Sequence, residues 1–184
     1  MTKSNIAKAI TVLRNGGVIA YPTEAVYGLG CDPFNEAAVK RIATIKNRSL
    51  DKGFIVIASE WQQVTQLITT IDPQIKQRIL ANPVAVTTWI IPVKSSVPDW
   101  IRGTHQSLAI RITQHPTAKA ICDAFGAAII STSANRSGEA PIRDFSELEQ
   151  TFIKKVDYFV TGNLGKQSKP SEIRDAISNQ ILRS

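Results

Sequence analysis

The chain has 184 residues, of which 43% are hydrophobic and 20% are charged, as in an ordinary globular protein of one or two domains. No apolar run approaches the roughly 20 residues that a membrane helix needs, and the N-terminal segment lacks the apolar core of a signal peptide, so we expect a cytoplasmic protein without a membrane anchor. The net charge of +7 and the pI near 9.6 favour an anionic partner, which can be a nucleic acid or a nucleotide.

Helical and strand patterns alternate along the whole chain. Ser4 can cap a first helix that runs to about Arg14, and a glycine pair separates it from a buried strand at residues 18–21. Asn35 can cap a second helix, which residues 54–58 follow as a strand. Further helices are predicted at residues 61–68, 73–80 (capped by Asp72), 116–125 and 145–156, further strands at 87–93, 108–113, 127–132 and 158–160, and a hairpin about residues 178–179.

The alternation continues without a Pro-rich or Ser-rich linker, an internal repeat or a low-complexity run. We therefore predict a single domain over residues 1–184, of the α/β class (mixed α+β), with a mixed sheet. In such sheets, the loops that leave the strand ends commonly form the functional site.

Two loops in the first third of the chain are rich in polar and charged residues. PTEAVYGLG at residues 22–30 places Thr23, Glu24 and Tyr27 at the exit of a strand. KNRSLDKG at residues 46–53 carries Lys46, Arg48 and Lys52, and such cations suit phosphate oxygens. A tight turn with incidental polar residues and a solvated basic turn remain open as alternatives.

Two later loops and one strand add further polar groups. STSANRSG at residues 131–138 offers hydroxyl and amide groups after a strand, although ordinary loop composition also explains it, and the chemistry of KPSEIRDA at residues 169–176 is not evident from its residues. Arg111 lies within the apolar strand LAIRIT, so it needs an anionic partner, which is either a ligand or a carboxylate of the protein.

Several common catalytic signatures are absent or imperfect. GNLGKQS at residues 162–168 has two residues between its glycines where a Walker loop has four, so we reject a P-loop. His105 and His115 show no zinc-ligand spacing, and no G-x-S-x-G element supports a serine nucleophile. Cys31 and Cys122 are expected to be buried, reduced thiols.

The order of these motifs resembles one known family. YPTEAVYGLG, KNR followed by KG, LAIR, STSANRSG and KPSEIRDA occur in the same order in the YrdC-like threonylcarbamoyl-AMP synthases, and the match is similar to their short bacterial branch, called TsaC. The chain departs from this pattern at residues 83–87, where it has PVAVT and many relatives have PGPVT. Any nucleotide contact by that loop is therefore open, although Thr87 is retained.

The resemblance implies a three-layer domain with a twisted, open mixed sheet, flanking helices and a basic cavity. It implies a reaction in which threonine captures bicarbonate or carbon dioxide as a carbamate, which attacks the α-phosphate of ATP and releases pyrophosphate; the product then passes to a transferase complex that modifies tRNA. The side chains expected to hold ATP are Lys46, Arg48, Lys52, Ser131, Ser133 and Asn135. Those expected around threonine are Thr23, Tyr27 and Arg111, while Thr87 and Ser171 would close the cavity.

The resemblance further implies Mg²⁺ bound with ATP, without defining any protein ligands for the ion. Phosphoryl transfer depends mostly on positioning and charge neutralisation, so no dedicated catalytic residue is expected. Two alternatives remain: a carbamoyl-adenylate synthase of the same fold, and a non-catalytic module that binds RNA or tRNA through its basic face. Weak tRNA contact is also compatible with the enzyme.

Overall fold

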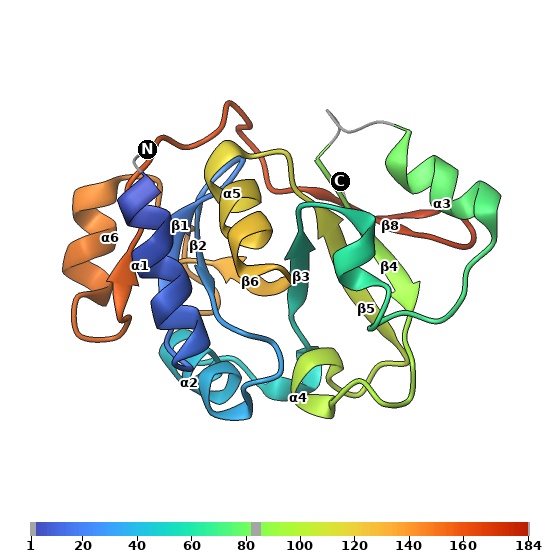
Figure 1. Ribbon diagram of the computed structural model, residues 1–184, viewed down its shortest axis with the longest axis horizontal. Coiled ribbons are helices and arrows are strands. Elements are labelled where there is room, and N and C mark those ends of the chain that lie inside the picture. The colour runs from blue at the N-terminus through green and yellow to red at the C-terminus, as the bar shows by residue number, and fades with distance from the viewer. Residues whose placement is uncertain (1–2, 82–85, 184) are drawn as a thin grey trace.

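A computed structural model describes residues 3–81 and 86–183, and the strands of this part of the chain form one nine-stranded mixed sheet (Figure 1). The strands are β1 (Ile19–Pro22), β2 (Tyr27–Gly30), β3 (Ile55–Ala58), β4 (Thr87–Pro92), β5 (Ser107–Ile112), β6 (Ile129–Ser133), β7 (Tyr158–Phe159), β8 (Glu172–Asp175) and β9 (Ile181–Arg183). Their spatial order is β7-β1-β2-β6-β3-β5-β4-β8-β9. Because β6 pairs antiparallel with both β2 and β3, it joins the two halves of the sheet.

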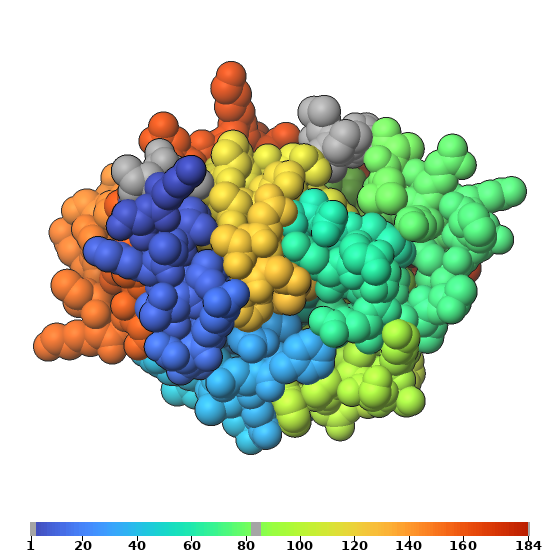
Figure 2. Space-filling model, in the orientation of Figure 1, coloured from blue at the N-terminus to red at the C-terminus, as the bar shows by residue number. Residues whose placement is uncertain are grey.

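Helices cover both faces of the sheet. They are α1 (Lys3–Arg14), α2 (Glu36–Lys46), α3 (Pro73–Leu80), α4 (Asp99–Arg102), α5 (Pro116–Phe125) and α6 (Phe145–Phe152), with 3₁₀ turns η1 (Leu50–Lys52) and η2 (Trp61–Val64). On one face α1 and α5 pack against the sheet, and Figure 2 shows them side by side in blue and yellow-orange. On the other face α2, α4 and α6 pack against a larger apolar cluster.

Alternation along the strands produces these two apolar layers. In β6, Ile129 joins the cluster under α1 and α5, whereas Ile130 joins the cluster under α2 and α6. Ile57 and Val56 of β3 divide in the same way, since successive side chains of a strand point to opposite faces. The predicted mixed α/β fold with flanking helices is confirmed.

The helices that begin with proline match their predicted ranges. α3 and α5 begin at Pro73 and Pro116, where the side chains of Asp72 and His115 accept backbone N–H groups. Asn35 caps α2 as predicted, through a 2.9 Å hydrogen bond from the Ala38 N–H. Both cysteines are free and buried, as expected, and burial raises the pKa of Cys122 to about 12.

Other predicted boundaries were wrong. The segment 61–68 is a 3₁₀ turn followed by a β-bridge between Ile68 and Val93, and α6 ends at Phe152, where residue 156 was predicted. Residues 27–30 and 172–175 form β2 and β8, although both lie in segments predicted to be loops. The first strand of the C-terminal hairpin is therefore β8, which pairs antiparallel with β9.

Residues 82–85, which include most of the PVAVT departure, lie outside the described residues. Within the described part of the chain, none of the helices has the length and apolar character needed to span a bilayer.

Candidate active site

A cavity of about 510 Å³ opens where β2, β3, β5 and β6 meet the loops that follow β1 and precede β8. Its volume is in the range of small-molecule sites. All four sequence motifs that were read as site loops contribute to its wall, and so does Arg111 from β5. Residues far apart in the sequence, from Thr23 to Arg183, therefore surround one chamber.

The lining is strongly cationic. The described lining contains one carboxylate, that of Glu24, together with His105 and five Lys and Arg side chains, which are Arg48, Lys52, Arg102, Arg111 and Arg183. Seven residues with hydroxyl groups also line the cavity: Thr23, Tyr27, Ser107, Ser131, Thr132, Ser133 and Ser171. A chamber with this excess of positive charge suits a polyanionic ligand.

Lys46 and Arg48 lie on either side of the C-terminus of α2, and only Arg48 is among the cavity-lining residues. Asn47 adopts a left-handed conformation with φ 50° and ends the helix between Lys46 and Arg48. Arg48 lines the cavity, where its guanidinium donates to the Gly53 carbonyl at 2.9 Å and lies over the Phe54 ring. The loop predicted to bind phosphates therefore brings Arg48 and Lys52 to the cavity wall.

Lys46 is buried and is not among the residues that line the cavity. Its ammonium donates to the Ser133 carbonyl at 2.5 Å, the Asn135 carbonyl at 2.8 Å and Asn135 Oδ1 at 3.1 Å. Burial, and then the neighbouring Arg48, lowers the pKa of Lys46 to about 8. In this structure Lys46 holds the segment after β6 in place.

Two glycines allow the loop of Lys52 to pack against α4. Gly53 and Gly103 have φ values of +57° and +69°, and a Cβ on Gly53 would lie 2.7 Å from the Arg102 carbonyl. A Cβ on Gly103 would lie 2.1 Å from the Asp51 carbonyl. No other residue permits this close approach without strain, which places Lys52 and Arg102 on the same wall of the cavity.

The C-terminal half of β6 supplies two of the serine hydroxyl groups. Ser131 accepts a 2.7 Å hydrogen bond from the buried Tyr21 hydroxyl, and Ser133 donates to Asn135 Oδ1 at 2.5 Å. Ser131 and Ser133 line the cavity, whereas Asn135 is not among the lining residues. The Asn135 amide donates to the carbonyls of Arg136 and Glu139 and so braces its own turn.

The loop after β1 contributes Thr23 and Tyr27 to the same cavity. The Thr23 hydroxyl donates to the Val26 carbonyl at 2.7 Å and closes the turn between β1 and β2. The Tyr27 hydroxyl donates to the Gly162 carbonyl at 3.4 Å, and its ring packs against Phe145.

Ser171 lines the cavity next to β8, and its hydroxyl lies 2.7 Å from that of Thr88. Thr87, the neighbour of Thr88 in β4, is not among the lining residues. The hydroxyl that contacts Ser171 is therefore that of Thr88 and not that of Thr87.

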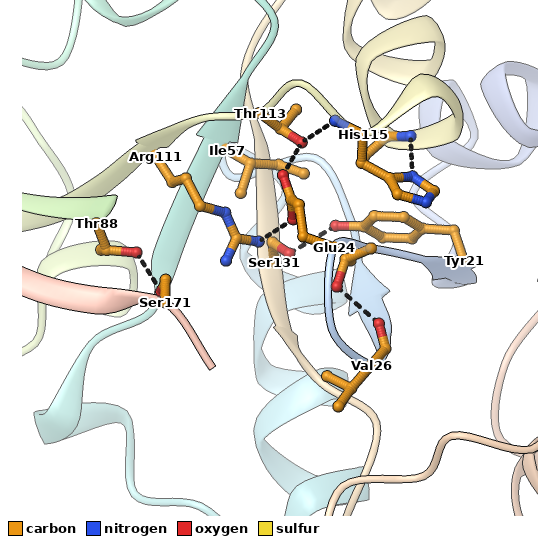
Figure 3. A network of polar contacts seen from close by, with 12 residues as sticks. Tyr21, Glu24, Val26, Ile57, Thr88, Arg111, Thr113, His115, Ser131 and Ser171 are labelled. Atoms are coloured by element: carbon orange, nitrogen blue, oxygen red, sulfur yellow. Dashed lines mark hydrogen bonds and ion pairs between the residues drawn. The ribbon is translucent and has the colours of Figure 1, made fainter. Parts of the chain in front are cut away.

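Arg111 has its anionic partner inside the protein. Its Nη2 lies 3.6 Å from Glu24 Oε2, and both side chains are almost fully buried. Figure 3 shows the Glu24 carboxylate between the Arg111 guanidinium and the Thr113 hydroxyl, which donates to Oε1 at 2.6 Å. Burial raises the pKa of Glu24, but Arg111 and the Thr113 hydrogen bond outweigh burial and hold this pKa below its usual value.

Sequence reasoning missed two basic residues of the cavity. Arg102 is the last residue of α4 and lies outside the motifs, and its guanidinium donates to the carbonyls of Val97 and His105. Arg183 lies on β9 and donates to the Ser171 carbonyl at 2.9 Å. An arginine within the apolar segment QILR was the available signal for Arg183, as it was for Arg111 within LAIRIT.

The described residues bring no three Asp, Glu, His or Cys side chains together in a group that could hold a metal ion. The carboxylate in the cavity lining is that of Glu24, which is already engaged by Arg111 and Thr113.

Comparison with known proteins gives consistent matches over nearly the whole chain. A family model for Sua5, YciO and YrdC proteins, described as "Telomere recombination", matches residues 11–184. The chain is 51% identical to a Threonylcarbamoyl-AMP synthase of Coxiella burnetii over 97% of this chain and 96% of that protein. It is 46% identical to the protein of the same name from Methylococcus capsulatus over 95% of this chain and 94% of that protein.

Solved structures agree with these sequence matches. Sua5 of P. abyssi, solved in complex with L-threonine, matches with a TM-score of 0.88 and 27% identity over 95% of this chain and 52% of that chain. YciO of E. coli matches with a TM-score of 0.84 and 25% identity over 100% of this chain and 90% of that chain. The chain belongs to the Sua5/YciO/YrdC family.

Proposed function

We propose that this protein is a threonylcarbamoyl-AMP synthase, which converts L-threonine, bicarbonate or carbon dioxide, and ATP into threonylcarbamoyl-adenylate and pyrophosphate. The observation that carries the proposal is the cavity whose described lining holds five Lys and Arg side chains and one carboxylate. Relatives up to 51% identical carry this enzyme's name, and a related Sua5 has been solved with L-threonine.

The reaction has two steps, which are formation of a carbamate and its transfer to the α-phosphate of ATP. The neutral amine of threonine attacks the carbon of carbon dioxide, or of bicarbonate with loss of water, and forms a carbamate after losing a proton. A carbamate oxygen then attacks the α-phosphorus of ATP, and the bond to the bridging oxygen breaks to release pyrophosphate. Negative charge accumulates on the phosphate oxygens, so fixed cations supply most of the catalysis that the protein can provide.

The cationic wall suits this task. Arg48 and Lys52 come from the loop after α2, and Arg183 comes from β9, so they would contact the triphosphate from different elements. Arg48 is pre-oriented by its bond to the Gly53 carbonyl and by the Phe54 ring. Such preorganisation lowers the reorganisation that charge development would otherwise require. Ser131 and Ser133 would complete the nucleotide pocket.

The threonine end lies around Arg111. A planar guanidinium binds a carboxylate through two N–H groups, and the Arg111 side chain lines the cavity. We assign the substrate carboxylate to this group, and Thr23 and Tyr27 line the same cavity. Mg²⁺ is expected to enter with ATP, bound by phosphate oxygens, and would neutralise part of their charge.

The product is a reactive mixed anhydride, so it must be consumed by a transferase. We propose that a tRNA threonylcarbamoyl transferase complex in the cytoplasm uses it for the adenosine beside the anticodon, with at most weak contact between tRNA and this protein.

Pyrophosphate release from ATP tests the proposal directly. Release should require L-threonine, bicarbonate and Mg²⁺ together. Arg48→Ala/Lys52→Ala should lower kcat/KM for ATP by about 100-fold, since each hydrogen bond to a charged group contributes roughly 1.5 kcal/mol. Lys40→Ala is the matched control, because Lys40 is exposed and pairs with Glu36 on the surface of α2.

The test also separates the alternatives. Salt-sensitive tRNA binding without any pyrophosphate release would replace the enzyme with an RNA-binding module. Release that uses carbamoyl phosphate and ignores threonine would indicate a carbamoyl-adenylate synthase.

A further inference from the structure

The ion pair between Glu24 and Arg111 is incomplete. Arg111 Nη2 and Glu24 Oε2 lie 3.6 Å apart, whereas a charge-assisted hydrogen bond between such groups is about 2.7–2.9 Å long. Arg111 Nε and Glu24 Oε2 are both buried without a hydrogen-bond partner among the described residues. Both side chains line the cavity, so this pair forms part of the surface that a ligand would meet.

Glu24 is held rigidly from two sides. Its backbone carbonyl accepts the Gln167 N–H at 3.1 Å, and the preceding Thr23 carbonyl accepts the Gly165 N–H at 2.9 Å. A Cβ on Gly165 would lie 2.5 Å from the Glu24 carbonyl oxygen, so the two segments touch. The Thr113 hydroxyl donates to Glu24 Oε1 and accepts the His115 N–H at 3.2 Å, which fixes the direction of the Thr113 proton (Figure 3).

Arg111 has no comparable support for its guanidinium. Its backbone is fixed by the parallel pairing of β5 with β3, where Arg111 lies opposite Ile57. Within residues 3–81 and 86–183, however, the structure gives its side chain one charged partner, which is Glu24. The position of the guanidinium in the cavity therefore depends on the Glu24 carboxylate.

We propose that Glu24 is a positioning residue that holds the Arg111 guanidinium at the amino-acid end of the cavity, where it binds the substrate carboxylate. The inference rests on the proposed function, because it assumes that an amino acid is the ligand of Arg111. The proposed function assigns the phosphates to Arg48, Lys52 and Arg183, whereas Glu24 pairs with Arg111. Loss of the Glu24 charge should therefore affect threonine and leave ATP binding nearly unchanged.

The experiment measures KM for threonine, KM for ATP and kcat in threonine-dependent pyrophosphate release. Glu24→Gln keeps the shape of the side chain and an acceptor for Thr113 while removing its charge. We expect KM for threonine to rise by about tenfold, equivalent to one weakened charge-assisted contact, with KM for ATP unchanged. Glu36→Gln, which breaks a surface ion pair with Lys40, should change none of the three constants.

Thr113 supplies a second, independent pair of variants. Thr113→Val removes the hydroxyl that anchors Glu24 and keeps the volume, so KM for threonine should rise. Thr113→Ser keeps the hydroxyl and should restore most of the affinity. A merely structural role of Thr113 would instead lower kcat and the thermal stability without a selective change in KM for threonine.

A double-mutant cycle shows whether Glu24 acts through Arg111. In an Arg111→Gln background, Glu24→Gln should raise KM for threonine no further. The double variant also keeps the test sound if Glu24→Gln alone unfolds, because it leaves no unpaired buried charge.

An unchanged or lowered KM for threonine in Glu24→Gln would overturn the inference, since Glu24 would then be irrelevant or would compete with the substrate for Arg111. If the unsubstituted protein releases no pyrophosphate with threonine, the proposed function fails and this inference fails with it.

Discussion

Lys46 connects the end of α2 to the segment after β6, and it does so with one ammonium group. Its three acceptors belong to Ser133 and Asn135, and the Ser137 N–H returns a bond to the Lys46 carbonyl at 2.7 Å. The resemblance assigns Lys46 to phosphate binding, and that role stays a prediction. The contacts also indicate that Lys46 affects the site indirectly, because it binds the carbonyl of Ser133, a residue that lines the cavity.

We predict that Lys46→Met lowers the free energy of unfolding by about 2–3 kcal/mol, because buried oxygens lose their donor. KM for ATP should also rise, since the Ser133 segment would relax. Urea unfolding and steady-state kinetics measure the two effects. Lys40→Met removes an exposed lysine from the same helix and should alter neither. Full stability combined with a raised KM would show that Lys46 serves the ligand alone.

At the scale of the elements, Asp157 ties three parts of the fold together. Its Oδ2 accepts the Val18 N–H at 2.7 Å at the start of β1, and the Arg41 guanidinium of α2 donates to both carboxylate oxygens. Burial raises the pKa of Asp157, but Arg41 and the Val18 N–H outweigh it, so the pKa lies below its usual value. When the pKa of a carboxyl is lower in the folded protein than in the unfolded chain, the group stabilises the fold at pH values above its unfolded-state pKa, which is near 4. This contribution disappears as the pH falls through the pKa of the folded state.

We therefore predict that Asp157→Asn lowers the free energy of unfolding by about 1 kcal/mol at pH 7, a small value because the pair is partly exposed. The difference from the unsubstituted protein should persist at pH 5 and shrink towards pH 3. Urea unfolding at the three pH values measures it, with exposed Glu60→Gln as the control. An equal difference at pH 3 and pH 7 would assign the effect to the hydrogen-bonding shape of Asp157 and not to its charge.

Elements with a local signal could be predicted from the sequence, and those that depend on pairing could not. Proline and a capping side chain define α3 and α5 without help from the rest of the chain. β2 contains Gly28 and Gly30, which indicate a loop, yet a Cβ on Gly30 would lie 2.7 Å from the Ile130 carbonyl, so the glycine permits the close pairing with β6. The need for glycine at this position becomes evident only from the pairing of β2 with β6.

The site follows the same rule. The motifs identified Arg48, Lys52, Ser131 and Arg111, which all line the cavity. Whether Lys46 or Arg48 faces the cavity depends on the left-handed turn at Asn47, and whether Thr87 or Thr88 meets Ser171 depends on strand alternation. Arg183 joins the site only because β8 and β9 fold back beside β4.

At the scale of the whole molecule, β3 and β6 contribute side chains to both apolar clusters, which favours one cooperative unit over residues 1–184. The three tryptophans offer a test, because Trp61, Trp89 and Trp100 all lie in or against the larger cluster. Leu13 of α1 is fully buried in the other cluster. A probe in one layer can therefore report on damage to the other.

We predict that Leu13→Ala lowers the free energy of unfolding by about 2–5 kcal/mol through the cavity that it leaves. Tryptophan fluorescence and far-UV circular dichroism should report one shared urea midpoint in each protein, and both midpoints should fall together in the variant. Leu182→Ala, at an exposed position on β9, should shift the midpoint only slightly. An unchanged fluorescence midpoint beside an earlier loss of helical signal would mean that α1 and α5 unfold as a separate unit, and the single-domain prediction would then be wrong.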